Sequence, residues 1–253
     1  MKTTQLLRNA AASLVAAAGV FSATAASAAP TAVQLDQGLL NQFNTDYVQN
    51  EGAFLSNAGS LQVDLSTLTF ADGADSLDVF FINEGAGYRN QLAFSGGSYS
   101  GEMIFDDIAS SESVLSETNG PLSLGDGFSY TSGLNAGDSV TFDLFSNGRN
   151  DYLFGTGTNV DGLQHVVGYE YTDNLGDSWI ILGFEDLYGE LDATGVDTAT
   201  GLNNEGSDRD FNDVVIAVKG LSAQQQSVPE PGMVMGLAGA AALGALRRRK
   251  SAK

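Results

Sequence analysis

The chain of 253 residues contains no cysteine and only one histidine, one tryptophan and four prolines. Without cysteine, no disulfide can stabilise the fold and no thiolate can bind a metal. With His165 as the single histidine, a zinc site built on two histidines is excluded, including the H-E-x-x-H motif of metalloproteases. The sequence also lacks a G-x-S-x-G nucleophile elbow, which argues against a Ser-His-Asp hydrolase.

The sequence also contains few basic residues. The chain has 11 Lys and Arg against 31 Asp and Glu, which gives a net charge of −20. Between the two ends of the chain, the basic residues are only Arg89, Arg149, Arg209 and Lys219. Such an acidic surface repels nucleic acid and anionic lipid and attracts divalent cations. We therefore expect no nucleic-acid partner, and we expect bound metal to offset the repulsion in a domain without disulfides.

The first 28 residues have the order of a secretory signal peptide. Lys2 and Arg8 give a positive start, residues 10–24 are apolar and rich in alanine, and an A-S-A sequence ends at Ala28. We predict that signal peptidase cleaves after Ala28, so that the domain is exported. The alternative is an uncleaved N-terminal anchor, which the shortness of the apolar stretch disfavours.

The C-terminal residues show three features in a fixed order: a proline-flanked acidic sequence, an apolar run and a basic cluster. They are Val228-Pro229-Glu230-Pro231, then residues 232–246, then Arg247, Arg248, Arg249 and Lys250. As a helix, the apolar run would be about 22 Å long, shorter than the hydrocarbon core of roughly 30 Å. The basic cluster is expected to stop the chain at the membrane, because Lys and Arg resist crossing. We expect a marginal anchor that holds the protein in the inner membrane only transiently.

This order resembles the PEP-CTERM sorting signal. The resemblance implies that a membrane-embedded exosortase processes the tail, in a bacterium of a kind that often makes extracellular polysaccharide. The expected partners are therefore signal peptidase and exosortase, with extracellular polysaccharide as a further candidate. The alternative is an ordinary single-pass C-terminal anchor, and either reading exports the middle of the chain.

The middle of the chain has the pattern of a β domain. Apolar residues alternate over residues 61–65, 77–81 and 140–144, which is typical of half-buried strands. Residues 211–218 become apolar on both faces, which indicates a central strand. Asn-Gly or Asp-Gly pairs that begin at residues 72, 119, 126, 147 and 161 predict the turns. The predicted fold class is all-β, a β-sandwich or jelly roll over residues 61–221.

Two segments flank this domain. Apolar residues at helical spacing predict a short amphipathic helix over residues 37–50, inside an N-terminal arm of residues 29–60. An irregular arm without a helix is the alternative. Residues 222–227 include three glutamines, and we expect them to be a polar linker between the domain and the tail.

Acidic side chains concentrate beside two of the predicted strands. The strand 179–184 is followed by Glu185, and the strand 211–218 is preceded by Asp208 and Asp210. If the two strands pair as a hairpin, both groups lie at one end of the sheet, and an extended chain would turn Asp208, Asp210 and Asn212 to one side. The candidate metal ligands at these two strand ends are Glu185, Asp186, Asp208, Asp210, Asn212 and Asp213.

The ligand types at this position favour calcium. Calcium takes six to eight hard oxygen ligands from carboxylates, amides and backbone carbonyls. The spacing is not that of an EF-hand, because no D-x-D-x-D-G run with a glutamate at its twelfth position occurs. Two alternatives stay open: a loop that is acidic only because the whole protein is acidic, and a pair of catalytic carboxylates.

Three segments resemble the motifs of a domain of unknown function found in exported bacterial proteins. In order, they are E-G-A-G-Y-R-N at 84–90, D-G-L-Q-H-V at 161–166, and E-D-L at 185–187 with D-R-D-F-N-D-V-V at 208–215. The resemblance spans residues 77 to 218 and implies a β-rich, calcium-binding extracellular module without assigned activity. The loop 188–207 is longer here than in that family, which leaves the metal geometry open.

Taken together, the sequence predicts a non-catalytic, calcium-binding β domain at the cell surface or in the extracellular matrix. One alternative is a carbohydrate-binding module of the same architecture that binds exopolysaccharide through exposed aromatic residues. Another is a glycoside hydrolase or lyase that uses paired carboxylates. His165 is expected to be a hydrogen-bonded structural residue rather than a catalytic one.

Overall fold

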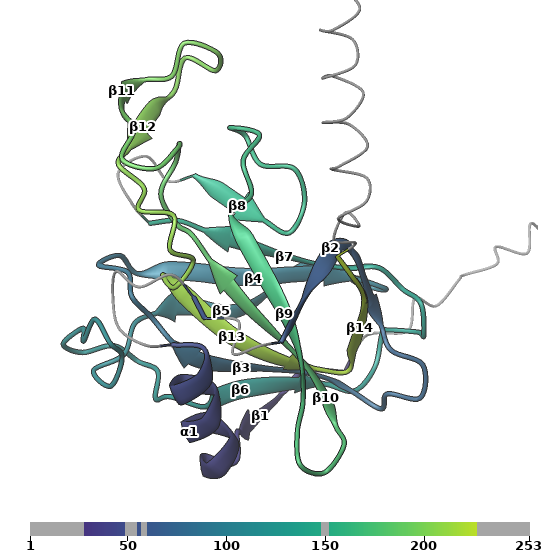
Figure 1. The fold of residues 1–253 in the computed structure, drawn as a ribbon. Coiled ribbons are helices and arrows are strands. Elements are labelled where there is room, and N and C mark those ends of the chain that lie inside the picture. Colours follow the sequence, from purple (N-terminus) through teal and green to yellow (C-terminus); the bar gives the residue numbers. More distant parts are fainter. Residues whose placement is uncertain (1–27, 49–54, 57–59, 148–151, 227–253) are drawn as a thin grey trace, which may run out of the picture.

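The computed structural model describes residues 28–48, 55–56, 60–147 and 152–226, with strands β1 to β14 and the helix α1 (Figure 1). Most of the expected signal peptide and the whole C-terminal tail lie outside the described residues, including Val228 to Pro231 and Arg247 to Lys250. None of the helices in the described part is long and apolar enough to cross a bilayer.

The largest sheet has eight antiparallel strands in the order β1-β6-β3-β13-β10-β9-β2-β14. In chain order they are β1 (Thr31–Gln34), β2 (Leu61–Phe70), β3 (Leu77–Asn83), β6 (Asp126–Tyr130), β9 (Val166–Thr172), β10 (Ser178–Phe184), β13 (Val214–Lys219) and β14 (Leu221–Gln225). A second sheet has the order β5-β4-β7-β8, with β4 (Asn90–Gly96), β5 (Tyr99–Ile108), β7 (Val140–Phe145) and β8 (Leu153–Gly155). A separate pair joins β11 (Thr194–Val196) to β12 (Asn203–Glu205).

The two larger sheets pack against each other over one apolar core. Alternate residues of β3, β10 and β13 point into this core from the large sheet, and residues of β4, β5 and β7 meet them from the small sheet. Aromatic contacts cross the interface, with the Phe94 and Tyr130 rings 4.8 Å apart and the Phe81 and Phe105 rings 6.4 Å apart. The predicted all-β sandwich is confirmed.

The helix α1 (Gln37–Asp46) covers the outer face of the large sheet, so that β10 and β13 are buried on both faces. It begins after Asp36, whose side chain accepts hydrogen bonds from the amides of Gly38 and Leu39. Phe43 packs edge-on against Trp179 of β10, with ring centroids 5.6 Å apart. The predicted helix is confirmed but ends at Asp46, and residues 49–50 of its expected range lie outside the described part.

The edges of the large sheet differ from the prediction. The expected N-terminal arm contributes β1, which pairs with β6. Residues 222–225, expected to be linker, continue β14, which pairs with β2 to form an edge ribbon. This ribbon joins the rest of the sheet through β2, by the pairs Leu61 with Glu170 and Gln62 with Tyr169. A polar sequence can form an edge strand because one of its faces remains in solvent.

Most of the predicted turns that can be checked are present. Gly73, Asn119 and Gly162 have left-handed φ angles of 76°, 70° and 73°, as turn residues do. The turn predicted at Asp126-Gly127 is wrong, because both residues lie in β6. A Cβ on Gly127 would meet the backbone oxygen of Val79 at 2.5 Å, so the glycine allows close strand packing there.

The pairing of β10 with β13 positions the acidic residues. Phe184, the last residue of β10, pairs with Val214, the first residue of β13. Glu185 follows β10 and Asp213 precedes β13, so both residues lie at the same end of the paired strands. The predicted hairpin is therefore confirmed. Its long connection carries β11 and β12, which project from this end of the sheet (Figure 1).

Candidate metal centre

Three of the six predicted ligands converge. Glu185, Asp210 and Asp213 each offer a carboxylate oxygen, and these oxygens all lie within 4.8 Å of one another. Their exposed fractions are 0%, 5% and 9%, respectively. Carboxylates this close and this buried cannot all stay ionised without a compensating cation.

The pKa values reflect this crowding. Burial raises the pKa of Glu185 to about 7, with the charges of Asp208 and Asp186 adding to the effect. Burial also raises the pKa of Asp213 well above its usual range, and the neighbouring charges of Asp186 and Glu185 raise it further. Within the described part of the chain, Oε2 of Glu185 is buried without a hydrogen-bond partner. The cluster therefore requires either bound protons or a bound cation.

The backbone before β13 is not extended, which corrects one prediction. Arg209 and Phe211 have left-handed φ angles of 57° and 61°, so the alternation expected for Asp208, Asp210 and Asn212 does not hold. Instead the chain winds around Asp210, whose carboxylate accepts hydrogen bonds from the backbone and side-chain amides of Asn212 at 3.0 and 2.9 Å. This winding brings Asp210 beside Asp213.

The other three predicted ligands lie at different places. The Asp186 amide donates to Oδ2 of Asp213 at 2.8 Å, but the Asp186 side chain accepts a hydrogen bond from Asn90 at 2.7 Å. Burial raises the pKa of Asp186 to about 6. Asn212 bonds to Asp210 and lies beside the cluster, whereas Asp208 is exposed and is not among the converging carboxylates.

The segment 84–90 packs directly against this centre, a role that the sequence did not reveal. The Gly85 amide donates to the backbone oxygen of Asn212 at 3.0 Å. Glu84 is fully buried, and burial raises its pKa to about 8. Among the described residues Oε1 of Glu84 has no hydrogen-bond partner, while its Oε2 accepts from the Ser110 amide. The order of the three motifs along the chain was the only signal that linked this segment to the acidic strand ends.

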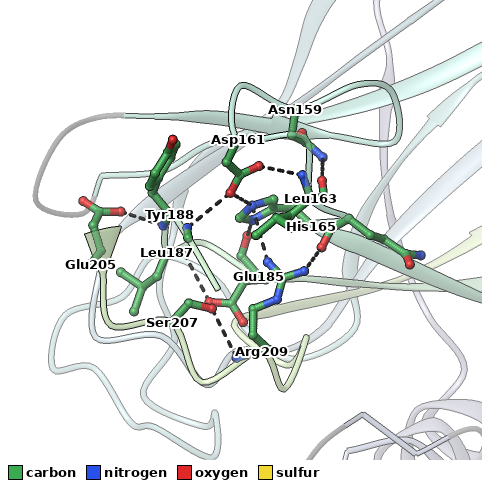
Figure 2. A network of polar contacts seen from close by, with 12 residues as sticks. Asn159, Asp161, Leu163, His165, Glu185, Leu187, Tyr188, Glu205, Ser207 and Arg209 are labelled. Atoms are coloured by element: carbon green, nitrogen blue, oxygen red, sulfur yellow. Dashed lines mark hydrogen bonds and ion pairs between the residues drawn. The ribbon is translucent and has the colours of Figure 1, made fainter. Parts of the chain in front are cut away.

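The segment 161–166 contacts the backbone of Glu185, one of the three converging residues (Figure 2). His165 contacts Oδ2 of Asp161 through Nε2 at 2.8 Å and the backbone oxygen of Glu185 through Nδ1 at 3.1 Å. In return, the Glu185 amide donates to the His165 backbone oxygen at 2.9 Å. The imidazole stacks on Phe154 at 3.8 Å. His165 is thus buried and hydrogen-bonded, as the sequence analysis expected.

Asp161 is held ionised in this network. Burial alone would raise the pKa of Asp161, but hydrogen bonds from His165 and from the amides of Leu163 and Gly189 lower it to about 2. Arg209 reaches the same side and donates to the backbone oxygen of Gln164. Both oxygens of the Asp161 carboxylate accept hydrogen bonds, and this carboxylate holds the His165 ring in place. His165 in turn contacts the backbone oxygen of Glu185 and so fixes its position.

Comparison with known proteins identifies the end of the chain. Residues 227–250 match the PEP-CTERM protein-sorting motif. No curated protein and no solved structure shows significant similarity to the chain. The resemblance of residues 77–218 to a domain of unknown function stays a prediction. The PEP-CTERM motif shows that the chain is an exported protein sorted to the cell surface, and it implies processing of the tail by an exosortase.

Proposed function

We propose that this exported protein is a non-catalytic, calcium-binding β-sandwich of the cell surface or extracellular matrix. In this proposal calcium binds between Glu185, Asp210 and Asp213. The observation that carries it is the convergence of three buried carboxylates within 4.8 Å, one of them with an oxygen that has no partner in the described residues. The three residues come from the ends of two central strands, so the ion would join these ends.

The chemistry of the donors supports calcium over other metals. All three are carboxylates, and hard oxygen donors favour calcium, magnesium or manganese over zinc or copper. Magnesium demands near-ideal octahedral geometry and loses its water reluctantly, whereas calcium accepts irregular sets of ligands. A crowded set of short, buried side chains therefore favours calcium.

The burial of the cluster supports a structural role over a catalytic one. A glycoside hydrolase or lyase needs two carboxylates that a substrate can reach. Here the three carboxylate side chains are nearly inaccessible to solvent. The His165 ring also contacts the backbone oxygen of Glu185, which holds this residue in place. The remaining parts of the proposal concern export: signal peptidase cleaves after Ala28, and the tail holds the protein transiently in the inner membrane before exosortase acts.

A calcium titration followed by thermal unfolding tests this function. Extracellular calcium modules bind with dissociation constants of roughly 10⁻⁴–10⁻³ M, and a ligand at a hundredfold its dissociation constant adds about 2.7 kcal/mol to the stability. Calcium at about 10 mM, roughly ten to a hundred times these constants, should therefore add about 1.4–2.7 kcal/mol and raise the melting temperature of the exported protein by several degrees. Magnesium at matched ionic strength should raise it much less, because it gives the same charge screening without a fitting site.

Variants separate the site from general screening. Asp210→Asn should abolish the calcium-specific increment and keep the increment due to salt. Asp72→Asn removes one charge from an exposed position in the loop before β3 and should leave the calcium increment intact. Equal effects of calcium and magnesium on the wild type would overturn the proposed site.

A further inference from the structure

A pocket of about 550 Å³ opens where β4, β5 and β7 lie side by side, outside the sandwich core. Its volume is in the range of small-molecule sites, about 300–1,000 Å³. Its lining combines one aromatic ring with planar polar side chains: Arg89, Gln91, Asp106, Asp107, Phe145 and Asn147. None of these residues belongs to the carboxylate cluster of the candidate metal centre.

We propose that this pocket binds a neutral saccharide and that the metal centre holds one of its walls in place. The second part rests on the proposed calcium site, and the first part does not. Four observations carry the proposal: an exposed ring, oriented polar groups, the charge balance of the lining, and a hydrogen-bonded connection to Asp186.

The exposed ring is Phe145, at the end of β7. Its neighbours Leu144 and Phe142 are buried, whereas 40% of Phe145 is exposed on the outer side of the sheet. Phe145 pairs with Leu153 of β8, which is 49% exposed, so the two form a small apolar strip. A flat ring beside a shallow apolar strip fits the C–H face of a pyranose, which is apolar while its rim of hydroxyls is polar.

The polar groups are held in fixed orientations. Arg89 makes a bidentate pair with Asp107, at 2.7 Å from Nε to Oδ1 and 2.5 Å from Nη2 to Oδ2. The side-chain amide of Gln91 donates to the backbone oxygen of Asp106 at 2.9 Å. These contacts do not use Nη1 of Arg89 or Oε1 of Gln91, so a donor and an acceptor can face ligand hydroxyls.

The charge of the lining selects against other ligand classes. The charge of Arg89 is compensated by Asp107, and Asp106 adds a further negative charge. An anionic ligand such as a phosphate or a uronate chain would meet net repulsion, in keeping with the charge of −20 on the whole chain. An apolar ligand would leave the polar lining without partners. A neutral, hydroxyl-rich ligand avoids the charge repulsion and also gives the polar lining its hydrogen-bond partners.

The pocket is connected to the metal centre by hydrogen bonds. The backbone amide of Asn147 donates to Oδ1 of Asn90 at 3.0 Å, and Nδ2 of Asn90 donates to Asp186 at 2.7 Å. Ser146, also in the lining, donates to the Asp186 backbone oxygen at 2.7 Å. The Asp186 amide in turn donates to Asp213. A cation that fixes Asp213 therefore also fixes the wall formed by residues 146 and 147.

Affinity electrophoresis of the exported protein tests the pocket. The gels contain dextran, hydroxyethylcellulose or galactomannan as neutral probes, and carboxymethylcellulose as an anionic one, all with millimolar calcium. The wild type should be retarded by at least one neutral polysaccharide and not by carboxymethylcellulose. Phe145→Ala should weaken this binding roughly tenfold, the scale of one aromatic contact. Leu61→Ala, at an exposed apolar residue of β2, is the matched control and should bind normally.

A second set of gels with EGTA in place of calcium tests the coupling, and Trp179 fluorescence verifies that the protein stays folded under these conditions. Weaker retardation in EGTA supports the connection through Asp186. Retardation that Phe145→Ala loses but EGTA leaves unchanged overturns the coupling alone. Absence of retardation by every neutral probe, or equal retardation of wild type and Phe145→Ala, overturns the pocket. The calcium titration decides the proposed function separately.

Discussion

Gly85 lies in direct contact with Asn212. The Gly85 amide donates to the Asn212 backbone oxygen at 3.0 Å, and a Cβ on Gly85 would come within 2.0 Å of Oδ1 of Asn212. Asn212 directly precedes Asp213 in the chain, and its backbone and side-chain amides donate hydrogen bonds to the Asp210 carboxylate. The absence of a side chain at residue 85 therefore sets the position of the segment that brings the carboxylates together.

Gly85→Ala should destabilise the protein and weaken its calcium response. The methyl group forces Asn212 to move, and an overpacked site of this kind costs about 1–3 kcal/mol. For a domain of this size, that corresponds to a fall in melting temperature of roughly 2–4 °C per kcal/mol. Gly87→Ala is the matched control, since its Cβ would meet only Leu115 at 3.9 Å. Equal melting temperatures for the two variants would contradict this account.

The stability of the metal-free protein should fall as the pH rises from about 4.5 to about 8. Burial raises the pKa of Glu84 to about 8 and that of Glu185 to about 7, from a usual value of 4.5. Over this range the folded state holds protons that the unfolded state has released, so the free energy of unfolding decreases with pH. Asp161, with a pKa lowered to about 2, has its effect below this window.

Calcium should weaken this dependence, because the ion replaces the protons on the cluster. The increment in melting temperature due to calcium should thus be larger at pH 8 than at pH 5. Melting curves in calcium-free and calcium-containing buffers across this range provide the measurement. A metal-free melting temperature that is constant or rises with pH would rule out the proposed protonation of the buried carboxylates.

Glu185→Gln should stabilise the metal-free protein at pH 8 and remove its response to calcium. The substitution keeps the shape of the side chain and removes one buried negative charge beside Asp213. We expect the metal-free melting temperature to rise by a few degrees, since one pKa unit corresponds to about 1.36 kcal/mol. Glu190→Gln, at an exposed position, should change neither quantity. A metal-free Glu185→Gln protein that melts below the wild type would show that the charge is otherwise compensated.

Replacement of both Pro229 and Pro231 by alanine should leave uncut protein in the membrane fraction. These residues lie within the matched sorting motif, which implies exosortase processing. Immunoblots of the membrane and extracellular fractions measure the outcome. Pro121→Ala, at an exposed position of the folded domain, is the control and should be processed normally. If the double variant is released like the wild type, the prolines do not direct processing.

The strand pattern predicted the part of the site that follows from pairing. Strands 179–184 and 211–218 were expected to form a hairpin, and their pairing brings Glu185 to the same sheet end as Asp213. Alternation and burial of apolar residues are local signals, and they place the ends of strands well. The central position of β13 followed in the same way from its apolar character on both faces.

The parts that were missed depend on backbone conformation and on contacts between distant residues. The left-handed angles of Arg209 and Phe211 occur at residues whose types do not favour them, so the alternating pattern suggested an extended chain. Asn90 bonds to Asp186 from 96 residues away, a contact set by the packing of the two sheets rather than by any local pattern. Asp208 was included among the ligands because sequence cannot distinguish an exposed carboxylate from a buried one beside it.

Strand β14 is the first part of the fold that a pull on the C-terminal tail would load. The chain leaves the folded domain through β14, immediately before the sorting motif that begins at residue 227. Tension on the C-terminus thus acts first on the pairing of β14 with β2, and then, through Gly220, on β13. Strand β13, which follows Asp210 and Asp213 and pairs with β10, bears the load only after β14 has separated from β2. Under a pull from its tail, the domain should lengthen at one edge while its centre remains folded.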